Sequence, residues 1–145
     1  MSFTEKQSWV LLIAVLGSTA LYLSTVLDRP AGQALVETPY MWPMLRAVGA
    51  TVVLTIIGSI VIAIPAASRE GCDEGEFEAD ERDKDIDRRG EVIGYLVFSV
   101  GVLNALVLTL AESAHFWIGN AIYLSGALAT MVACVIKLFL YRRGF

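Results

Sequence analysis

Charged side chains are missing from four long stretches of this 145-residue chain. No Asp, Glu, Lys or Arg occurs within Gln7–Leu27, Ala47–Ser68, Val92–Ala111 or Ser113–Ile136. A helix needs about 20 apolar residues to cross the hydrocarbon core of a bilayer, and each stretch is that long. Because unpaired backbone amides are costly in lipid, we expect each stretch to form a transmembrane helix. A soluble domain is therefore excluded for most of the chain.

Histidine and cysteine are also scarce, with one His and two Cys in the chain. Zinc usually takes three or four protein ligands, so a single His argues against a metal site. One His also excludes a bis-histidine haem site within one chain, and two cysteines do not make a disulfide framework. No nucleophile lies beside a candidate base. We therefore predict no catalytic residue, no metal and no cofactor, and we expect that the protein is not an enzyme.

The composition predicts one all-α domain over residues 1–145, an integral membrane four-helix bundle that contacts the lipid bilayer. The spans are expected at about residues 7–27, 44–68, 92–111 and 114–137, with a charged loop at residues 69–91. Cytoplasmic loops carry the excess of Lys and Arg. Only Arg29 and Arg46 would lie on one side of the membrane, whereas nine lie on the other: Lys6, Arg69, Arg82, Lys84, Arg88, Arg89, Lys137, Arg142 and Arg143. We therefore expect a multi-pass protein of the cell membrane with both termini in the cytoplasm.

The loop between the second and third spans reads REGCDEGEFEADERDKDIDRRGE, with many acidic residues. Three acid–base pairs stand four residues apart with the acid first, which favours a helix: Glu78 with Arg82, Asp80 with Lys84, and Asp85 with Arg89. The loop thus predicts a charged cytoplasmic extension of the third helix, beginning near Phe77 or Asp80. It is either a solvated, self-paired helix or a docking surface for a cytoplasmic partner or a second copy of the chain.

The Asp80-Glu81-Arg82 triplet, followed by Ile86 and Arg89, is preceded by two apolar spans and followed by two more. In this organisation the chain resembles an uncharacterised family of small prokaryotic membrane proteins in which a D-E-R triplet opens the third helix. The family brings no established activity. The resemblance implies that Asp80, Glu81, Arg82, Ile86 and Arg89 are the residues to test for partner binding.

Small residues recur every four positions along three of the predicted spans. Close approach between small residues drives helix association in lipid, so we expect these stripes to form internal seams. A path for a substrate or ion is the alternative. The stripes are Ala47, Thr51, Thr55, Ser59, Ala63 and Ala67 in the second span, Gly101, Ala105 and Thr109 in the third, and Ala121, Ser125, Ala129 and Ala133 in the fourth.

A few polar side chains lie inside the predicted spans or at their ends. Asn104 and Asn120 are expected at similar depth, near enough to hydrogen-bond across the hairpin of the last two helices, or to form a polar binding site. Glu112 and His115 are expected at the outer rim, with Glu112 paired to Arg46. Lys137 is expected to extend toward the lipid headgroups.

These features favour a non-enzymatic accessory, regulatory or scaffolding subunit that presents Asp80–Arg89 to a partner protein. Nucleic acid is not an expected partner. The alternative is a small-solute or ion transporter or channel that oligomerises, with Asn104, Asn120, Ser125 and Thr55 lining the path. Proton coupling in such a transporter needs an ionisable residue well inside the membrane, and the spans contain no carboxylate.

Overall fold

Four long α-helices make up nearly all of the computed structural model, which describes residues 3–28, 30, 32–69 and 81–143, without the side chains of 65–69. They are α1 (Phe3–Leu27), α2 (Met41–Arg69), α3 (Glu81–Leu110) and α4 (His115–Arg143), and a short 3₁₀ helix, η1 (Leu35–Glu37), lies between α1 and α2. The described residues form no strand, which confirms the all-α prediction. All four helices are long and apolar enough to cross a membrane, so the chain is a multi-pass membrane protein.

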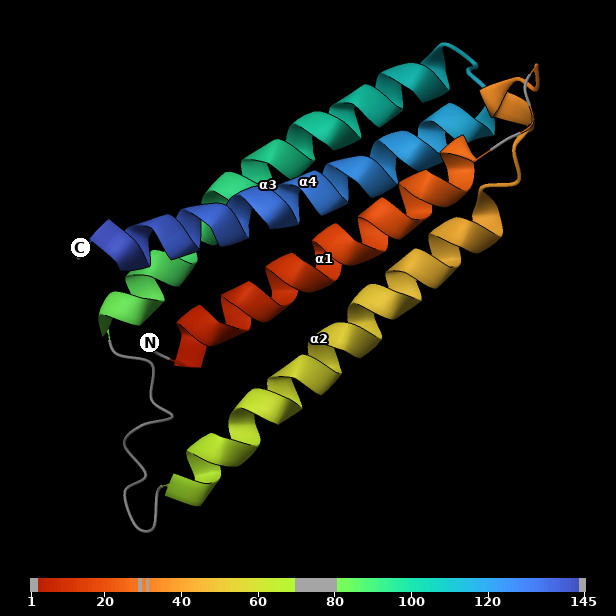
Figure 1. Ribbon diagram of the computed structural model, residues 1–145. Coiled ribbons are helices and arrows are strands. Elements are labelled where there is room, and N and C mark those ends of the chain that lie inside the picture. The colour runs from red at the N-terminus through yellow and green to blue at the C-terminus, as the bar shows by residue number, and fades with distance from the viewer. Residues whose placement is uncertain (1–2, 29, 31, 70–80, 144–145) are drawn as a thin grey trace.

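The helices lie side by side in the order α3, α4, α1, α2 (Figure 1). The main packing interfaces join α3 to α4, α4 to α1, and α1 to α2. These interfaces leave α2 and α3 at the two edges of the row. Lipid tails are as apolar as leucine, so no hydrophobic force drives the two outer helices together. Accordingly, 39% of an 18-residue apolar stretch of α1, which lies inside the row, is buried, whereas only 6% of the corresponding stretch of α2 at the edge is buried.

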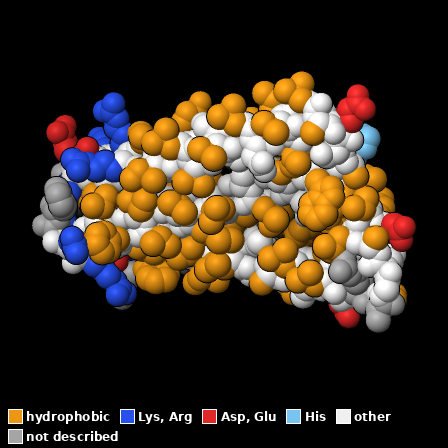
Figure 2. Space-filling view, turned by 90° about the horizontal axis from the view of Figure 1, so that it is seen from above, with side chains coloured by type: hydrophobic (Ala, Val, Ile, Leu, Met, Phe, Trp, Pro, Cys, Tyr) orange, Lys and Arg blue, Asp and Glu red, His pale blue; other side chains and the backbone are white. Residues whose placement is uncertain are grey.

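The two chain ends, the end of α2 and the start of α3 lie at one end of the row (Figure 1). Lys and Arg side chains gather at that end together with Asp and Glu, while the opposite end shows Asp, Glu and the single His (Figure 2). Of the Lys and Arg side chains that the structure describes, only Arg46 belongs to the far end. The molecule is therefore electrostatically asymmetric along the helix axes.

Two clusters of buried side chains hold the row together, one toward each end. The cluster toward the η1 end contains Tyr22, Val26, Ala47 and Phe116. The cluster toward the chain ends contains Leu12, Cys134 and Leu138. Both clusters include residues of α1 and α4, so these two helices form the centre of the fold.

The connection between α3 and α4 is a tight turn over residues 111–114. The amide of Ser113 donates to the carbonyl of Leu108 at 3.0 Å, and the amide of Glu112 donates to that of Thr109 at 3.0 Å. This is the Schellman pattern that closes many helices, and it needs one residue in the left-handed region. Glu112 takes that conformation, with φ of 52°. The turn brings α3 and α4 together as an antiparallel hairpin.

Candidate functional site

The first eleven residues of α3, 81–91, are here named the α3 extension because they precede the apolar part of the helix. Three side chains of the extension, those of Asp83, Ile86 and Asp87, face the rest of the fold. The hydroxyl Oγ1 of Thr4 in α1 donates to Oδ2 of Asp83 at 2.9 Å. Lys137 Nζ of α4 lies 2.5 Å from Oδ1 of Asp87. Ile86 is only 3% exposed. The described part of the extension begins at Glu81, and it is anchored to two other helices. The predicted starting points, Phe77 and Asp80, lie outside the described residues.

The outward face of the α3 extension carries six exposed charged residues: Glu81, Arg82, Lys84, Asp85, Arg88 and Arg89. Arg89 pairs with Asp85 one turn earlier at 2.9 Å, which is one of the three predicted acid-first pairs. The other two pairs involve Glu78 and Asp80, which lie outside the described residues. Four basic and two acidic side chains make this face cationic.

Ile86 does not belong to that outward face, although the sequence places it among the partner-binding residues. Its side chain points inward and is almost fully buried. Burial of the isoleucine side chain stabilises the fold because it removes apolar surface from water. On an exposed charged face this stabilisation would be lost. Ile86 is therefore not part of the outward face, while Glu81, Arg82 and Arg89 are exposed on it. The assignment of these residues to partner binding stays a prediction.

Glycines of α3 let the α3–α4 pair approach closely. A Cβ on Gly101 would collide with the side chain of Ser125, and one on Gly94 would lie 2.9 Å from Cβ of Ala133. Small residues at a helix interface allow such close backbone contact in a membrane. The predicted stripe on the fourth span, which includes Ser125 and Ala133, therefore does form a seam.

Lys137 is turned into the protein rather than out to the lipid headgroups. Its side chain is 13% exposed and crosses Gly90, where a Cβ would collide with the lysine stem. Besides Asp87, its Nζ faces Oε1 of Glu91 at 3.6 Å. The two carboxylates on α3 attract the ammonium more strongly than headgroups beyond the helix end do, because they are close and fixed. The expectation that Lys137 snorkels is thus corrected.

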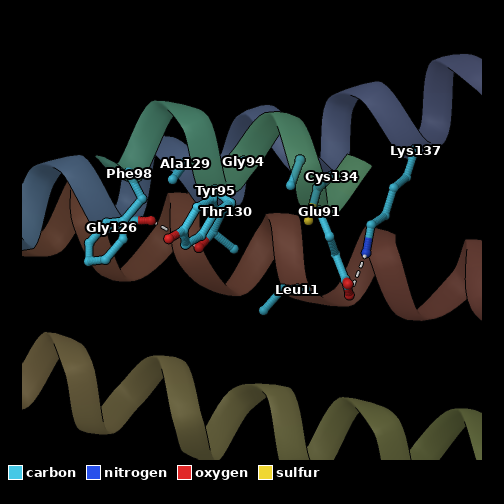
Figure 3. A pocket seen from close by; sticks show the side chains of 11 residues that line it. Leu11, Glu91, Gly94, Tyr95, Phe98, Gly126, Ala129, Thr130, Cys134 and Lys137 are labelled. Atoms are coloured by element: carbon cyan, nitrogen blue, oxygen red, sulfur yellow. Dashed lines mark hydrogen bonds and ion pairs between the residues drawn. The ribbon is translucent and has the colours of Figure 1, made fainter. Parts of the chain in front are cut away.

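A groove of about 410 Å³, here named the α3–α4 groove, runs beside this ion pair (Figure 3). Glu91 and Lys137 lie at one end of it, and Phe98 and Gly126 lie at the other. Cys134, which is 2% exposed, lies in its wall. Its lining is Leu11, Glu91, Gly94, Tyr95, Phe98, Gly126, Ala129, Thr130, Ala133, Cys134 and Lys137.

The two intramembrane asparagines do not bond to each other. Asn120 is 8% exposed; its Oδ1 accepts a hydrogen bond from the hydroxyl of Tyr22, and its Nδ2 donates to the carbonyl of Phe116 at 2.8 Å. Asn104 is exposed on α3. The predicted Asn104–Asn120 contact is therefore corrected: the hydrogen bond of Asn120 to another helix goes to Tyr22 and joins α4 to α1.

The other residues expected to line a transport path are also separated. Ser125 is packed in the α3–α4 seam. Thr55 lies on α2, where its hydroxyl donates to the carbonyl of Thr51 at 2.7 Å. Thr51 in turn bonds Ser18 of α1 at 2.6 Å, so this stripe forms the α1–α2 seam. Within one chain, therefore, Asn104, Asn120, Ser125 and Thr55 share no cavity that the structure describes.

Glu112 and His115 both lie exposed at the end of the molecule opposite the chain termini. The described part of the chain shows no ion pair between Glu112 and Arg46, so the predicted pairing is not present. No group of three or more His, Cys, Asp or Glu side chains that could hold a metal occurs among the described residues.

The sequence analysis did not predict two features of this site. The first is the close contact of α3 with α4 at Gly90 and Gly94, with Lys137 against Asp87 and Glu91. The second is the hydrogen bond between Tyr22 and Asn120. The signal for the first was present: Gly90 and Gly94 stand four apart, a spacing typical of close helix pairs, and Asp87 and Glu91 stand four apart on the same face. No signal in the sequence identified Tyr22 as the partner of Asn120, because the two residues are 98 positions apart.

Compared with known protein families, with curated proteins and with solved structures, the chain matches none of them. The resemblance to membrane proteins with a D-E-R triplet therefore stays a prediction. A functional conclusion has to come from the charged outward face, the α3–α4 groove and the arrangement of the four helices.

Proposed function

We propose that this chain is a non-enzymatic accessory, regulatory or scaffolding subunit of the cell membrane that docks a partner protein on the outward face of the α3 extension. The observation that carries this proposal is the contrast between the two faces of that segment. Its inward face makes the contacts that hold the fold, whereas its outward face is charged and exposed. A rigid, charged surface next to the membrane is suited to recognising a partner.

The charges of the outward face indicate which kind of partner fits it. The pair between Arg89 and Asp85 is satisfied within the helix. Among the described residues, Arg82, Lys84 and Arg88 have no carboxylate partner, and Glu81 is the one remaining acid on this face. Charge complementarity steers association and excludes wrong partners. An acidic segment of a cytoplasmic or membrane protein is therefore the expected ligand.

We place the α3 extension and both chain ends in the cytoplasm. Support comes from the distribution of basic residues: eight described Lys and Arg side chains lie toward that end, against Arg46 at the other. Lys and Arg near the membrane favour the cytoplasmic side, and Asp and Glu contribute little to this preference. A cytoplasmic extension is accessible to soluble partners as well as to membrane proteins.

Site-directed photocrosslinking in cells tests the docking surface. A photoreactive residue is placed at Arg82, Lys84 or Arg88, and matched probes at the exposed residues Lys6 and Arg142 serve as controls at the same end of the molecule. One partner should crosslink from the three positions on the outward face and not from the two controls. The proposal is contradicted if all five positions capture the same proteins, or if the outward face captures none.

Charge reversal then separates recognition from mere proximity. The double variant Arg82→Glu, Arg88→Glu should lower the crosslinking yield from Lys84 by at least about tenfold, because like charges across an interface repel. Arg89 is kept, since reversing it would also break the bond with Asp85. The control Arg142→Glu should retain the yield. Equal amounts of membrane-inserted protein must be confirmed for all variants.

A further inference from the structure

We infer that the α3–α4 groove binds a membrane phospholipid whose headgroup ends in an ammonium, with the ammonium at Glu91 and one acyl chain along the groove. Its volume of about 410 Å³ falls in the range of small-molecule sites and is too small for another helix. The groove follows the axes of α3 and α4 from Glu91 and Lys137 to Phe98 and Gly126 (Figure 3). Lipid binding here is independent of partner docking on the outward face.

Glu91 and Lys137 are the charged residues that line the groove, and both lie at the same end of it. Asp87 does not line the groove, but it contacts Lys137 from α3. Lys137 lies 2.5 Å from Asp87 but 3.6 Å from Glu91, so its charge is mainly taken up by Asp87. The Glu91 side chain is 68% exposed and directly precedes the apolar part of α3. A carboxylate at this level of a bilayer attracts a cationic headgroup and repels an anionic one.

An aromatic ring stands next to this carboxylate. Tyr95 follows Glu91 by one helical turn, which places both on the same face of α3, and both line the groove. Tyr95 is 70% exposed, so its ring is accessible to a ligand. A carboxylate beside an aromatic face is a combination that binds ammonium groups, through charge attraction together with cation–π contact.

The rest of the groove fits an acyl chain. From Lys137 to Gly126 it extends eleven residues along α4, about 16 Å at 1.5 Å per residue. Gly94 and Gly126 bring no side chain into this space, and Leu11, Phe98 and Ala129 make its surface apolar. Because the groove follows the axes of helices that cross the membrane, a lipid tail enters it without turning. The polar end and the apolar length thus match the two halves of one amphiphile.

Native mass spectrometry of the purified protein in detergent tests this site. The protein is titrated with an equimolar mixture of dioleoyl phosphatidylethanolamine and dioleoyl phosphatidylglycerol, which differ only in the headgroup. The wild type should retain the ethanolamine lipid at least roughly fivefold more than the glycerol lipid, as expected for one favourable exposed ion pair. Equal retention of the two lipids, or preference for the glycerol lipid, overturns the inference.

Two variants locate the binding to the groove. Glu91→Gln should bring the ratio of the two lipid adducts close to one, and the control Glu112→Gln, at the far end of the molecule, should leave it unchanged. Gly126→Leu should lower both adducts, because a Cβ there finds Phe98 at 3.7 Å and the longer side chain fills the groove. Gly49→Leu is its control, since no atom lies within 4 Å of a Cβ at that position.

Circular dichroism and thermal unfolding show whether these variants fold. If Gly126→Leu fails to fold, Glu91→Gln still decides the matter, because Lys137 keeps its closer ion pair with Asp87 at 2.5 Å when Glu91 is neutral. Selectivity for the ethanolamine lipid that is unchanged in Glu91→Gln overturns the assignment of the ammonium to this carboxylate.

Discussion

At the scale of single residues, the α3–α4 seam depends on positions where no side chain fits. Gly101 faces Ser125 so closely that even a methyl group would collide with it. By contrast, Gly49 on α2 faces open space. Glycine therefore has a different effect at these two positions. At Gly101 it permits close helix contact, and at Gly49 it only lowers helix stability.

These two glycines give a matched prediction. Gly101→Ala should lower the free energy of unfolding by about 1–3 kcal/mol, because the added methyl group overpacks a tight contact. Gly49→Ala should raise it by up to about 0.5–1 kcal/mol, because alanine loses less backbone entropy in a helix than glycine does. Unfolding by sodium dodecyl sulfate in mixed micelles measures both values. Changes of the same sign would contradict the seam as described.

At the scale of helices, each packing interface has its own polar bond. Ser18 with Thr51 joins α1 to α2, Tyr22 with Asn120 joins α1 to α4, and Lys137 with Asp87 joins α4 to α3. Apolar contact does not distinguish protein from lipid, so such bonds help to set which faces of the helices meet. The Lys137 bond has the further role of holding the α3 extension, the segment that presents the outward face.

Replacing Lys137 should therefore loosen the α3 extension. In Lys137→Met the lysine stem is approximately preserved, but Asp87 loses its ion pair. Amide hydrogens in residues 82–90 should exchange roughly fivefold faster, as expected when a partly exposed ion pair is lost from a local opening equilibrium. Hydrogen–deuterium exchange with mass spectrometry measures this rate. Lys84→Met, on the outward face of the same segment, is the control, and an equal effect of both variants would refute the anchoring role.

At the scale of the whole molecule, charge and packing are distributed differently. Basic side chains gather at one end of the helices, which relates to the direction in which the chain is inserted (Figure 2). Packing runs across the helices, with α1 and α4 at the centre and α2 at an edge. Insertion and packing thus depend mainly on different residues, although Lys137 belongs to both sets. The orientation can therefore be tested at exposed positions without disturbing the fold.

Cysteine labelling tests the orientation. In a background without the two native cysteines, Ala111→Cys places a thiol in the exposed turn between α3 and α4, and Arg142→Cys places one near the end of α4. A membrane-impermeant maleimide should label Ala111→Cys in intact cells, and Arg142→Cys only after permeabilisation. The reverse pattern would show that the chain ends lie outside.

Residues at long separation account for what sequence reasoning missed. The small-residue stripe of the fourth span was predicted as a seam because its spacing is local, and it is one. Ile86 was assigned to the partner surface by the family resemblance, and its burial depends on tertiary packing that the local sequence does not show. Asn120 was paired with Asn104 across the nearest turn, but its bond goes to Tyr22 on a helix much earlier in the sequence.

The sequence by itself determined that this chain has four membrane-spanning helices and that α3 continues into a charged segment. Both properties depend on runs of neighbouring residues, since hydropathy and helical spacing act over one or two dozen positions. Only the tertiary structure decided that the helices form an open row, that Lys137 turns inward to Asp87, and that a groove lies beside Glu91. These features depend on which helix faces meet, and in lipid that choice is made by a few close contacts rather than by overall hydrophobicity.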